Sequence, residues 1–430
     1  MSLRFGTDGV RGVALTELTT DFAASLGRAA ARALGGGRWI VGRDPRESGA
    51  VLERAVASGL IAAGAEVVSV GVVPTPMIAW LSQQWQCPAA MVTASHNPWH
   101  DNGVKVFAAG GAKLTSDLEQ RIEAAIDPSP VSMVDVTVID ERSSYVAHLL
   151  DGREPLDGLR VVIDCANGSM SVVAPAVFAA LGADVVSLHS DPDGRNINDA
   201  CGATHTAALE RAVVEHGASL GLAFDGDGDR VIAVDELGRV VDGDRLIALS
   251  ALQRRAEGRL AHDTVVVTVM SNLGFHRAMR EAGVRVVTTP VGDRHVLEAL
   301  EAGGFSVGGE QSGHIIHRDL ATTGDGLLAG LELVAHLRRS GEPLSVVADR
   351  VMTRYPQVLV NVTVRERHPD AAEQLASEIR EAEQSLGDGR VLVRASGTEP
   401  IVRVMVEAAT DEEAAVVAHR LADVVSARWA

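Results

Sequence analysis

The 430-residue sequence has few aromatic side chains and only three cysteines. Phe, Trp and Tyr together make up 3% of the chain, so its hydrophobic cores must be built from Ala, Val, Leu and Ile. Cys87, Cys165 and Cys201 are odd in number, far apart and without paired spacing. This pattern argues against a disulfide framework, and it predicts buried thiols in a reducing cytoplasm.

Positive charge is also scarce. The chain has 39 basic and 57 acidic residues and a net charge of −18, which argues against nucleic acid or a membrane surface as a partner. No run is long and apolar enough to span a bilayer, and the N-terminal stretch MSLRFGTDGVRG lacks the apolar core of a signal peptide. We therefore expect a cytoplasmic protein.

Lysine is nearly absent, since Lys105 and Lys113 are the only two and every other basic residue is arginine. A coding bias explains most of this imbalance. Where lysine persists, chance is one explanation, and a need for an ammonium that can give and take protons is the other. Lys105 lies in the polar stretch TASHNPWHDNGVK, whereas we expect no special role for Lys113.

Three passages of the sequence are similar: AGAEVVSV from Ala63, LGADVVSL from Leu181 and AGVRVVTT from Ala282. Each contains the end of a helix, a glycine and a short β-branched strand, and each follows an amphipathic helix and an earlier apolar strand. This order is typical of a βαβ unit in a parallel sheet. Three copies predict three related α/β domains of about a hundred residues each.

The last part of the chain has a different order of elements. A strand, PQVLVNVTV, and a helix, AAEQLASEIREAEQSL, precede the two strands GRVLVRAS and PIVRVMVEAA and a final helix, DEEAAVVAHRLADVVSA. We therefore predict an α/β protein with three related mixed α/β domains and a C-terminal α+β domain around a central active-site cleft. The predicted domains are residues 1–150, 151–250, 251–357 and 358–430.

The stretch FDGDGDRVIAVDE contains three aspartates that alternate with glycines: Asp225, Asp227 and Asp229. Carboxylates so close repel one another unless a cation neutralises them, and glycines let the backbone fold tightly around an ion. All-oxygen ligands suit Mg²⁺ or Ca²⁺. An EF-hand is excluded because its sixth position must be glycine and is Arg230, and because the flanks resemble strands. A solvated acidic turn is the alternative.

Ser95 follows the apolar strand CPAAMV, and Pro98 places it on a loop. A hydrolase nucleophile is disfavoured because the glycines of a nucleophile elbow are missing. A histidine directly after the serine, His96, tends to point away from it and makes a poor base. An ordinary turn rich in Ser and Asn is the other interpretation.

Two further motifs are rich in polar groups. In GGEQSGH, Glu310 could accept hydrogen bonds from sugar hydroxyls and His314 could transfer a proton. RASGTEP, together with a nearby arginine, offers donors that could grip a phosphate: Arg394, Ser396, Gly397, Thr398 and Arg403. Arg11, in FGTDGVRG, is a further candidate for the same anionic pocket. Polar surface turns are the alternative for both motifs.

Together, the motifs TASHNP, DGDGDR, GEQSGH and RASGTEP resemble those of the α-D-phosphohexomutase superfamily, in the family's order and over the whole chain. FGTDGVRG, NINDACGATH, VVVTVMSNLG, VGDRHVLEAL and GEQSGH resemble in particular the bacterial phosphoglucosamine mutases. Gln311 supports this, because the mutases of mannose and glucose phosphates commonly carry methionine there. A mannose or glucose phosphate mutase, a phosphatase and a non-catalytic sugar-phosphate-binding protein are the alternatives.

The resemblance implies an isomerase that interconverts glucosamine 6-phosphate and glucosamine 1-phosphate and so supplies UDP-N-acetylglucosamine and cell-wall synthesis. It implies a phosphorylated Ser95, a glucosamine 1,6-bisphosphate intermediate and one Mg²⁺ ion, and a phosphate oxygen on Ser95 would join the three aspartates as a metal ligand. The remaining residues that match family positions are the proton carriers Lys105 and His314, the reactive-end arginines Arg230 and Arg11, the sugar-binding Glu310 and Ser312, and the distal phosphate ligands named above. It also implies sugar phosphates as partners and a homodimer.

Overall fold

The computed structural model describes residues 3–6, 8–396 and 399–430. The chain divides into two compact units. The first unit comprises residues 1–270 and 284–350, and the second comprises residues 271–283 and 351–430. Among the described residues, no helix is long and apolar enough to cross a membrane. All three cysteines are buried and unpaired, as their spacing predicts.

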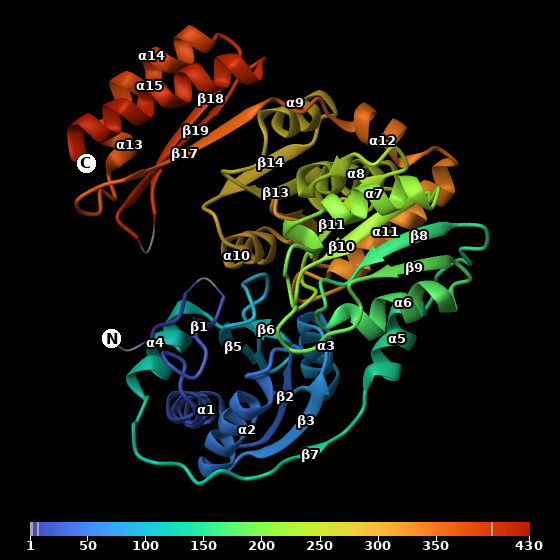
Figure 1. The fold of residues 1–430 in the computed structure, drawn as a ribbon, viewed down its shortest axis with the longest axis vertical. Helices are drawn as coiled ribbons and strands as arrows, with labels where there is room; N and C mark the ends of the chain where they lie inside the picture. Colours follow the sequence, from blue (N-terminus) through green and yellow to red (C-terminus); the bar gives the residue numbers. More distant parts are fainter. Residues whose placement is uncertain (1–2, 7, 397–398) are drawn as a thin grey trace. The chain divides into compact units, whose positions relative to one another are not determined.

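The first sheet of the first unit has the strand order β1-β5-β4-β2-β3-β7, with β6 paired to β5 (Figure 1). Its strands are β1 (Val10–Val13), β2 (Arg38–Arg43), β3 (Glu66–Val72), β4 (Ala89–Val92), β5 (Asp101–Ala108), β6 (Ala112–Lys113) and β7 (Thr137–Val138). The helices of this region are α1 (Thr20–Leu34), α2 (Gly49–Ala62), α3 (Thr75–Trp85), α4 (Ser116–Ala124) and α5 (Arg142–Leu150).

The second sheet of this unit has the order β12-β11-β10-β8-β9, and the third has the order β14-β13-β15-β16. The strands of the second sheet are β8 (Arg160–Asp164), β9 (Asp184–Leu188), β10 (Leu220–Phe224), β11 (Val231–Asp235) and β12 (Val240–Val241). Those of the third are β13 (Thr264–Thr268), β14 (Arg285–Thr289), β15 (Val307–Gly309) and β16 (Ile315–His317). The accompanying helices are α6 (Met170–Ala180), η1 (Gly202–Thr204), α7 (Ala207–Glu215), α8 (Gly243–Ala256), η2 (Ala261–Asp263), α10 (Asp293–Gly303), α11 (Gly326–Ser340) and α12 (Leu344–Val351).

The three sheets share one topology. A central strand (β2, β8 or β13) pairs in parallel with the next strand along the chain and with the one after it. That third strand (β4, β10 or β15) then pairs with an antiparallel partner. The three similar sequence passages form the equivalent strands β3, β9 and β14, as predicted. A polar motif follows the third strand in each sheet, so TASHNP, DGDGDR and EQSGH occupy the same topological position.

The second unit contains a three-stranded antiparallel sheet of order β17-β19-β18. Its elements are α9 (Leu273–Glu281), β17 (Gln357–Thr363), α13 (Ala371–Gln374), α14 (Ala376–Leu386), β18 (Arg390–Ala395), β19 (Ile401–Glu407) and α15 (Asp411–Trp429). The predicted order of strands and helices is confirmed, but the single helix expected over AAEQLASEIREAEQSL is wrong. The backbone leaves helical geometry at Leu375, with φ −106° and ψ 17°, so two helices form in its place.

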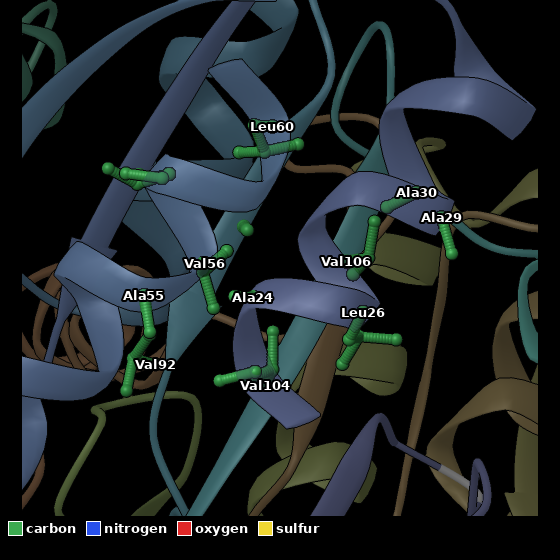
Figure 2. Packing of buried hydrophobic residues seen from close by; sticks show 14 of the residues in the cluster. Ala24, Leu26, Ala29, Ala30, Ala55, Val56, Leu60, Val92, Val104 and Val106 are labelled. Atoms are coloured by element: carbon green, nitrogen blue, oxygen red, sulfur yellow. The ribbon is translucent and has the colours of Figure 1, made fainter. Parts of the chain in front are cut away.

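One apolar cluster joins α1 and α2 to the first sheet. Small side chains such as Ala24, Ala29 and Ala30 on α1 lie in this cluster with Val104 and Val106 of β5 (Figure 2). The small side chains let the two helices approach closely. A Cβ on Gly27 would lie 2.3 Å from the Val56 carbonyl oxygen, and one on Gly59 would lie 1.9 Å from the Ala24 carbonyl oxygen. Backbone therefore packs on backbone where α1 and α2 cross.

Substitution of Gly59 with alanine should destabilise the first unit. Alanine gains about 1 kcal/mol of helix propensity, but overpacking against a backbone oxygen costs about 3 kcal/mol, so we expect a net loss of about 2 kcal/mol. The measurement is the urea midpoint of the first unfolding transition. Gly37→Ala is the control, because no atom lies within 4 Å of its added Cβ. Equal midpoints for the two variants would contradict close helix packing.

Candidate active site

The serine loop, residues 93–100, connects β4 to β5 and places Ser95 against the aspartates of the second sheet. The Ser95 hydroxyl donates a hydrogen bond to Asp225 Oδ2 at 2.6 Å. Its backbone N–H bonds to Thr93 Oγ1 at 2.9 Å, so the threonine at this position supplies the hydroxyl that orients the turn. Ser95 has a φ of 54°, which non-glycine residues rarely adopt. The surrounding contacts must therefore hold a strained residue in place.

Arg46 and Asn198 provide that support from outside the serine loop. The guanidinium of Arg46 is fully buried and donates to the carbonyl oxygens of Ser95, Asn97, Pro98 and Asp101. Asn198 Nδ2 donates to the Ser95 and Asn97 carbonyl oxygens at 2.9 and 3.0 Å. One arginine thus satisfies four carbonyl groups of the turn and fixes its shape.

The charge of Arg46 is balanced by Asp44, 2.9 Å away and also fully buried. Asp44 Oδ2 accepts a further hydrogen bond from Thr93 Oγ1 at 2.7 Å. Arg46 lies outside the motifs recognised in the sequence, and Asn198 lies in NINDACGATH, where the sequence indicated no role for it. The sequence feature that could have indicated Arg46 is the Asp-Pro-Arg turn directly after β2, where a charged pair follows the carboxyl end of a parallel strand.

The aspartate loop, residues 225–230, connects β10 to β11 and brings three carboxylates together. Oxygens of Asp225, Asp227 and Asp229 all lie within 4.8 Å of one another, and all three side chains are buried. Burial and the two neighbouring carboxylates raise the pKa of Asp225 well above its ordinary value. In the part of the chain that the structure describes, Asp227 Oδ1 and Asp229 Oδ1 are buried without a hydrogen-bond partner. Unsatisfied oxygens and excess negative charge fit a hard divalent cation such as Mg²⁺.

Lys105, on β5, has its ammonium group among the same carboxylates. Its Nζ lies 2.8 Å from Asp227 Oδ2, 2.8 Å from Asp229 Oδ2 and 2.6 Å from Asp8 Oδ2. Burial alone would lower the pKa of Lys105, but these three carboxylates raise it well above its ordinary value. Lys105, which drew attention in the sequence because lysine is rare, therefore lies at the candidate site as a buried cation.

Lys113 has a structural role that its sequence context does not indicate, so the expectation of no special role is wrong. Its Nζ pairs with Asp8 Oδ1 at 3.0 Å and with Asp293. Asp293 in turn lies 3.6 Å from His314 Nε2. Both lysines of the chain thus belong to one network of alternating charges, which extends from the aspartate loop to His314.

The GEQSGH loop, residues 309–314, begins at the last residue of β15, leads into β16 and carries His314 to the aspartates. His314 Nδ1 lies 3.6 Å from Asp229 Oδ1, and the imidazole is buried. Burial lowers the pKa of His314, but Asp229 and Asp293 outweigh it, so that the net pKa is raised. A hydrogen bond from the Val231 N–H to the Gly313 carbonyl oxygen, at 3.0 Å, attaches this loop to the start of β11.

Glu310 and Ser312 occupy the same loop with different exposure. Glu310 Oε1 accepts a hydrogen bond from the Gly292 N–H at 3.1 Å, which anchors its carboxylate. Ser312 is exposed, and Gln311 is partly exposed between them. The loop therefore combines accessible polar side chains with a buried histidine.

Arg230, Arg11 and His96 surround the serine. Arg230 Nε lies 3.9 Å from Asp229 Oδ1, and Arg11 Nη1 donates to the Ala94 carbonyl oxygen at 3.4 Å. The expectation that His96 points away from Ser95 is wrong, since His96 Nδ1 lies 3.4 Å from the Ser95 hydroxyl oxygen. The positive φ of Ser95 turns the chain and brings the two side chains to one side. Burial, with Arg230 and Arg11 nearby, lowers the pKa of His96 to about 4.

The predicted phosphate ligands of RASGTEP lie in the second unit. Arg394 on β18 and Arg403 on β19 are directly opposite in the antiparallel register. Among the described residues no carboxylate pairs with either guanidinium, and Arg403 Nε is buried without a partner. Ser396 is buried and accepts a hydrogen bond from the Glu399 N–H at 3.3 Å. Gly397 and Thr398 lie outside the described residues.

Comparisons with known families match nearly the whole chain. The descriptions "Phosphoglucomutase/phosphomannomutase, alpha/beta/alpha domain" I, II and III match residues 2–130, 143–238 and 242–355, and the C-terminal domain of the same family matches residues 359–424. The chain belongs to the phosphoglucomutase/phosphomannomutase family. It is therefore an isomerase that moves a phosphoryl group within a sugar phosphate, and its three aspartates are a group of ligands that could hold a metal ion.

Curated relatives of this phosphohexomutase cover its full length. A protein from Frankia casuarinae named phosphoglucosamine mutase is 54% identical over 98% of this chain and 97% of its own. A protein of the same name from Rhodococcus erythropolis is 49% identical over 99% of both chains. A solved phosphoglucomutase/phosphomannomutase family protein from Burkholderia thailandensis is 28% identical, with a TM-score of 0.81 over 98% of this chain and 97% of its own.

We expect Arg46→Lys to reduce the turnover of the phosphohexomutase by about a hundredfold, because misplacing a reacting group by about 1 Å has an effect of this size. Lysine keeps the charge beside Asp44 but cannot satisfy four carbonyl groups at once. Steady-state kinetics and circular dichroism measure activity and folding. Arg160→Lys, which changes an exposed ion pair with Asp184, is the control and should leave kcat unchanged. Normal turnover in a folded Arg46→Lys protein would show that the turn does not need this arginine.

Proposed function

We propose that this isomerase interconverts glucosamine 6-phosphate and glucosamine 1-phosphate, with Ser95 as the phosphoryl carrier, and thereby supplies UDP-N-acetylglucosamine and cell-wall synthesis. The observation that carries the proposal is the contact of the Ser95 hydroxyl with Asp225, at 2.6 Å, beside a buried cluster of three carboxylates. A hydroxyl at this position, once phosphorylated, has its phosphate next to a cation site. The full-length relatives named phosphoglucosamine mutase support the choice of sugar.

Asp225, Asp227 and Asp229 would hold one Mg²⁺ ion, and a phosphate oxygen on Ser95 would be a further ligand. Bound there, Mg²⁺ would polarise the phosphoryl group and balance its charge. Asp227 Oδ1 and Asp229 Oδ1 support this assignment. Within the described residues neither oxygen has a hydrogen-bond partner, so both are free to bind a metal. Arg230 and Arg11 supply further positive charge around Ser95.

The reaction needs two transfers of opposite direction. In the first, the bond between phosphorus and the Ser95 oxygen breaks, and a bond to the C1 oxygen of glucosamine 6-phosphate forms. The C1 hydroxyl loses its proton to a carrier, the departing Ser95 oxygen takes up a proton, and the product is glucosamine 1,6-bisphosphate. In the second, the phosphoryl group at O6 passes to the Ser95 hydroxyl, which loses its proton, and O6 gains a proton. Lys105 and His314 are the proposed proton carriers, since both contact Asp229 beside the serine loop.

Glu310 and Ser312 are the proposed sugar ligands, and the RASGTEP loop is the proposed site for the phosphate that does not react. Arg394 and Arg403 repel each other, and among the described residues no carboxylate compensates them. A phosphate dianion would neutralise both, and bidentate arginine contacts suit its geometry. With domains at residues 1–150, 151–250, 251–357 and 358–430, each domain would contribute one motif.

The remaining parts of the proposal concern compartment and assembly. We propose a cytoplasmic enzyme, which the three buried and unpaired thiols support. We also propose a homodimer, and light scattering of the purified chain tests it, since a monomer at every concentration would contradict the dimer.

A substrate comparison tests the proposed function. The purified chain, with Mg²⁺ and a trace of glucose 1,6-bisphosphate, is given glucosamine, glucose or mannose 6-phosphate in turn, and 1-phosphate formation is measured. We expect the highest kcat/KM with glucosamine 6-phosphate, and no rate above background after chelation of Mg²⁺ or in Ser95→Ala. Equal or higher kcat/KM with glucose or mannose 6-phosphate would identify the chain as a glucose or mannose phosphate mutase instead. Full activity in Ser95→Ala would refute the phosphoserine.

Replacement of Arg403 by glutamine should raise KM for glucosamine 6-phosphate by roughly ten- to a hundredfold, since a hydrogen bond to a charged group contributes about 1.5–3 kcal/mol. The effect on kcat should be smaller, because the residue holds the distal phosphate. Arg380→Gln, which removes an exposed arginine from α14 in the same unit, is the matched control. An unchanged KM in Arg403→Gln would rule out the phosphate clamp.

A further inference from the structure

A second group of metal-ligating side chains lies in the second sheet, away from the aspartate loop. Asp164 ends β8, His189 follows β9, and Cys201 directly precedes η1. β8 and β9 are neighbouring parallel strands, so their carboxyl ends meet at one edge of the sheet. A carboxylate oxygen of Asp164, a ring nitrogen of His189 and the sulfur of Cys201 all lie within 4.8 Å of one another.

The geometry of Asp164 and His189 differs from that of an ordinary hydrogen-bonded pair. His189 Nδ1 lies 3.1 Å from Asp164 Oδ1. Nevertheless, within the described residues this nitrogen is buried without a hydrogen-bond partner. Two ligands about 2.0–2.1 Å from one tetrahedral ion lie about 3.3 Å apart. The nitrogen and oxygen therefore already have the spacing of two ligands of a common ion.

We propose that Asp164, His189 and Cys201 form a second metal site, which takes a borderline-soft divalent cation such as Zn²⁺. A carboxylate oxygen, an imidazole nitrogen and a sulfur are a ligand set that Zn²⁺ accepts, whereas Mg²⁺ prefers oxygen alone. The set is chemically distinct from the three aspartates of the aspartate loop. Three protein ligands leave a fourth position for water.

The surrounding backbone orients the carboxylate of this site. Asp164 Oδ1 accepts a hydrogen bond from the Ala166 N–H at 2.9 Å, and Oδ2 accepts one from the Gly202 N–H at 3.0 Å. Such hydrogen bonds to ligating groups fix their direction toward a metal. The Cys201 thiol is buried, and a bound divalent ion would displace its proton.

The position of the site connects it to the serine loop. The Asn198 N–H donates to the Ala166 carbonyl oxygen at 2.9 Å, and the Asn198 side chain supports Ser95. Several non-glycine residues of these connections have positive φ angles, namely Ala166, Asn167, His189, Asn198 and Ala200. A metal at this position would tie three chain segments together directly behind the turn that carries Ser95.

Cobalt binding tests the proposal. Co²⁺ is titrated into chelator-treated protein in excess Mg²⁺, and the near-ultraviolet absorption that marks a bond between cobalt and a thiolate is measured. The aspartate loop has no sulfur and cannot give this signal. We expect saturation at one equivalent, loss of the signal on addition of Zn²⁺, and no signal in Cys201→Ser. Cys165→Ser and Cys87→Ser, which change the other two buried thiols, are matched controls and should keep it.

His189→Asn provides a second variant if Cys201→Ser fails to fold. The His189 side chain is 31% exposed, and asparagine tolerates the φ of 45° at this position. We expect its Co²⁺ affinity to fall at least about tenfold, in line with the sensitivity of metal sites to their ligand environment. The proposal is overturned by the absence of a thiolate signal at one equivalent, by its survival in Cys201→Ser, or by unchanged affinity in His189→Asn. The readout is independent of mutase activity, so failure of the proposed function does not affect it.

Discussion

The neutralisation of buried carboxylates is the constraint on which the candidate site depends. Asp8, Asp227 and Asp229 converge on the ammonium of Lys105, and Asp8 and Asp293 share that of Lys113. An unpaired charge in such surroundings is strongly destabilising, so each of these groups requires its partners. The first unit contributes acids and bases from all three of its sheets to this cluster. The same contacts that balance charge therefore join β5 and β6 to the aspartate loop and to the start of α10.

Local patterns in the sequence predicted Ser95, the three aspartates and His314, which the structure brings together, because these residues form short motifs with a physical meaning. Alternating glycines mark the aspartate loop, and Pro98 marks the serine loop. The repeated strand–helix–glycine–strand order also predicted the parallel strands. Supporting residues were missed, because their partners are distant in sequence. Lys113 contacts Asp293, 180 residues further along the chain, and nothing near Lys113 indicates that contact.

The shared topology of the three sheets explains how loops of different chemistry reach one place. Each loop leaves the third parallel strand and returns in an antiparallel partner, so both of its ends are fixed by ladder hydrogen bonds. This arrangement restricts the motion of Ser95, Asp225 and His314 more than a long crossover connection would. The three sheets also contribute different groups: the first contributes a hydroxyl, the second contributes carboxylates and the third contributes an imidazole.

The close approach of backbone to backbone between these loops limits how the enzyme can change. A Cβ on Gly226 would lie 2.6 Å from the Ser95 carbonyl oxygen, and one on Gly313 would lie 2.3 Å from that of Val231. A larger side chain at either glycine would therefore displace the backbone of the segment packed against it. On the same hairpin the Ser312 side chain is exposed and the Gln311 side chain is partly exposed. If this hairpin binds the sugar as proposed, exchange of these two side chains would alter sugar preference while the packed backbone of the loops stays intact, which would give one scaffold access to several hexose phosphates.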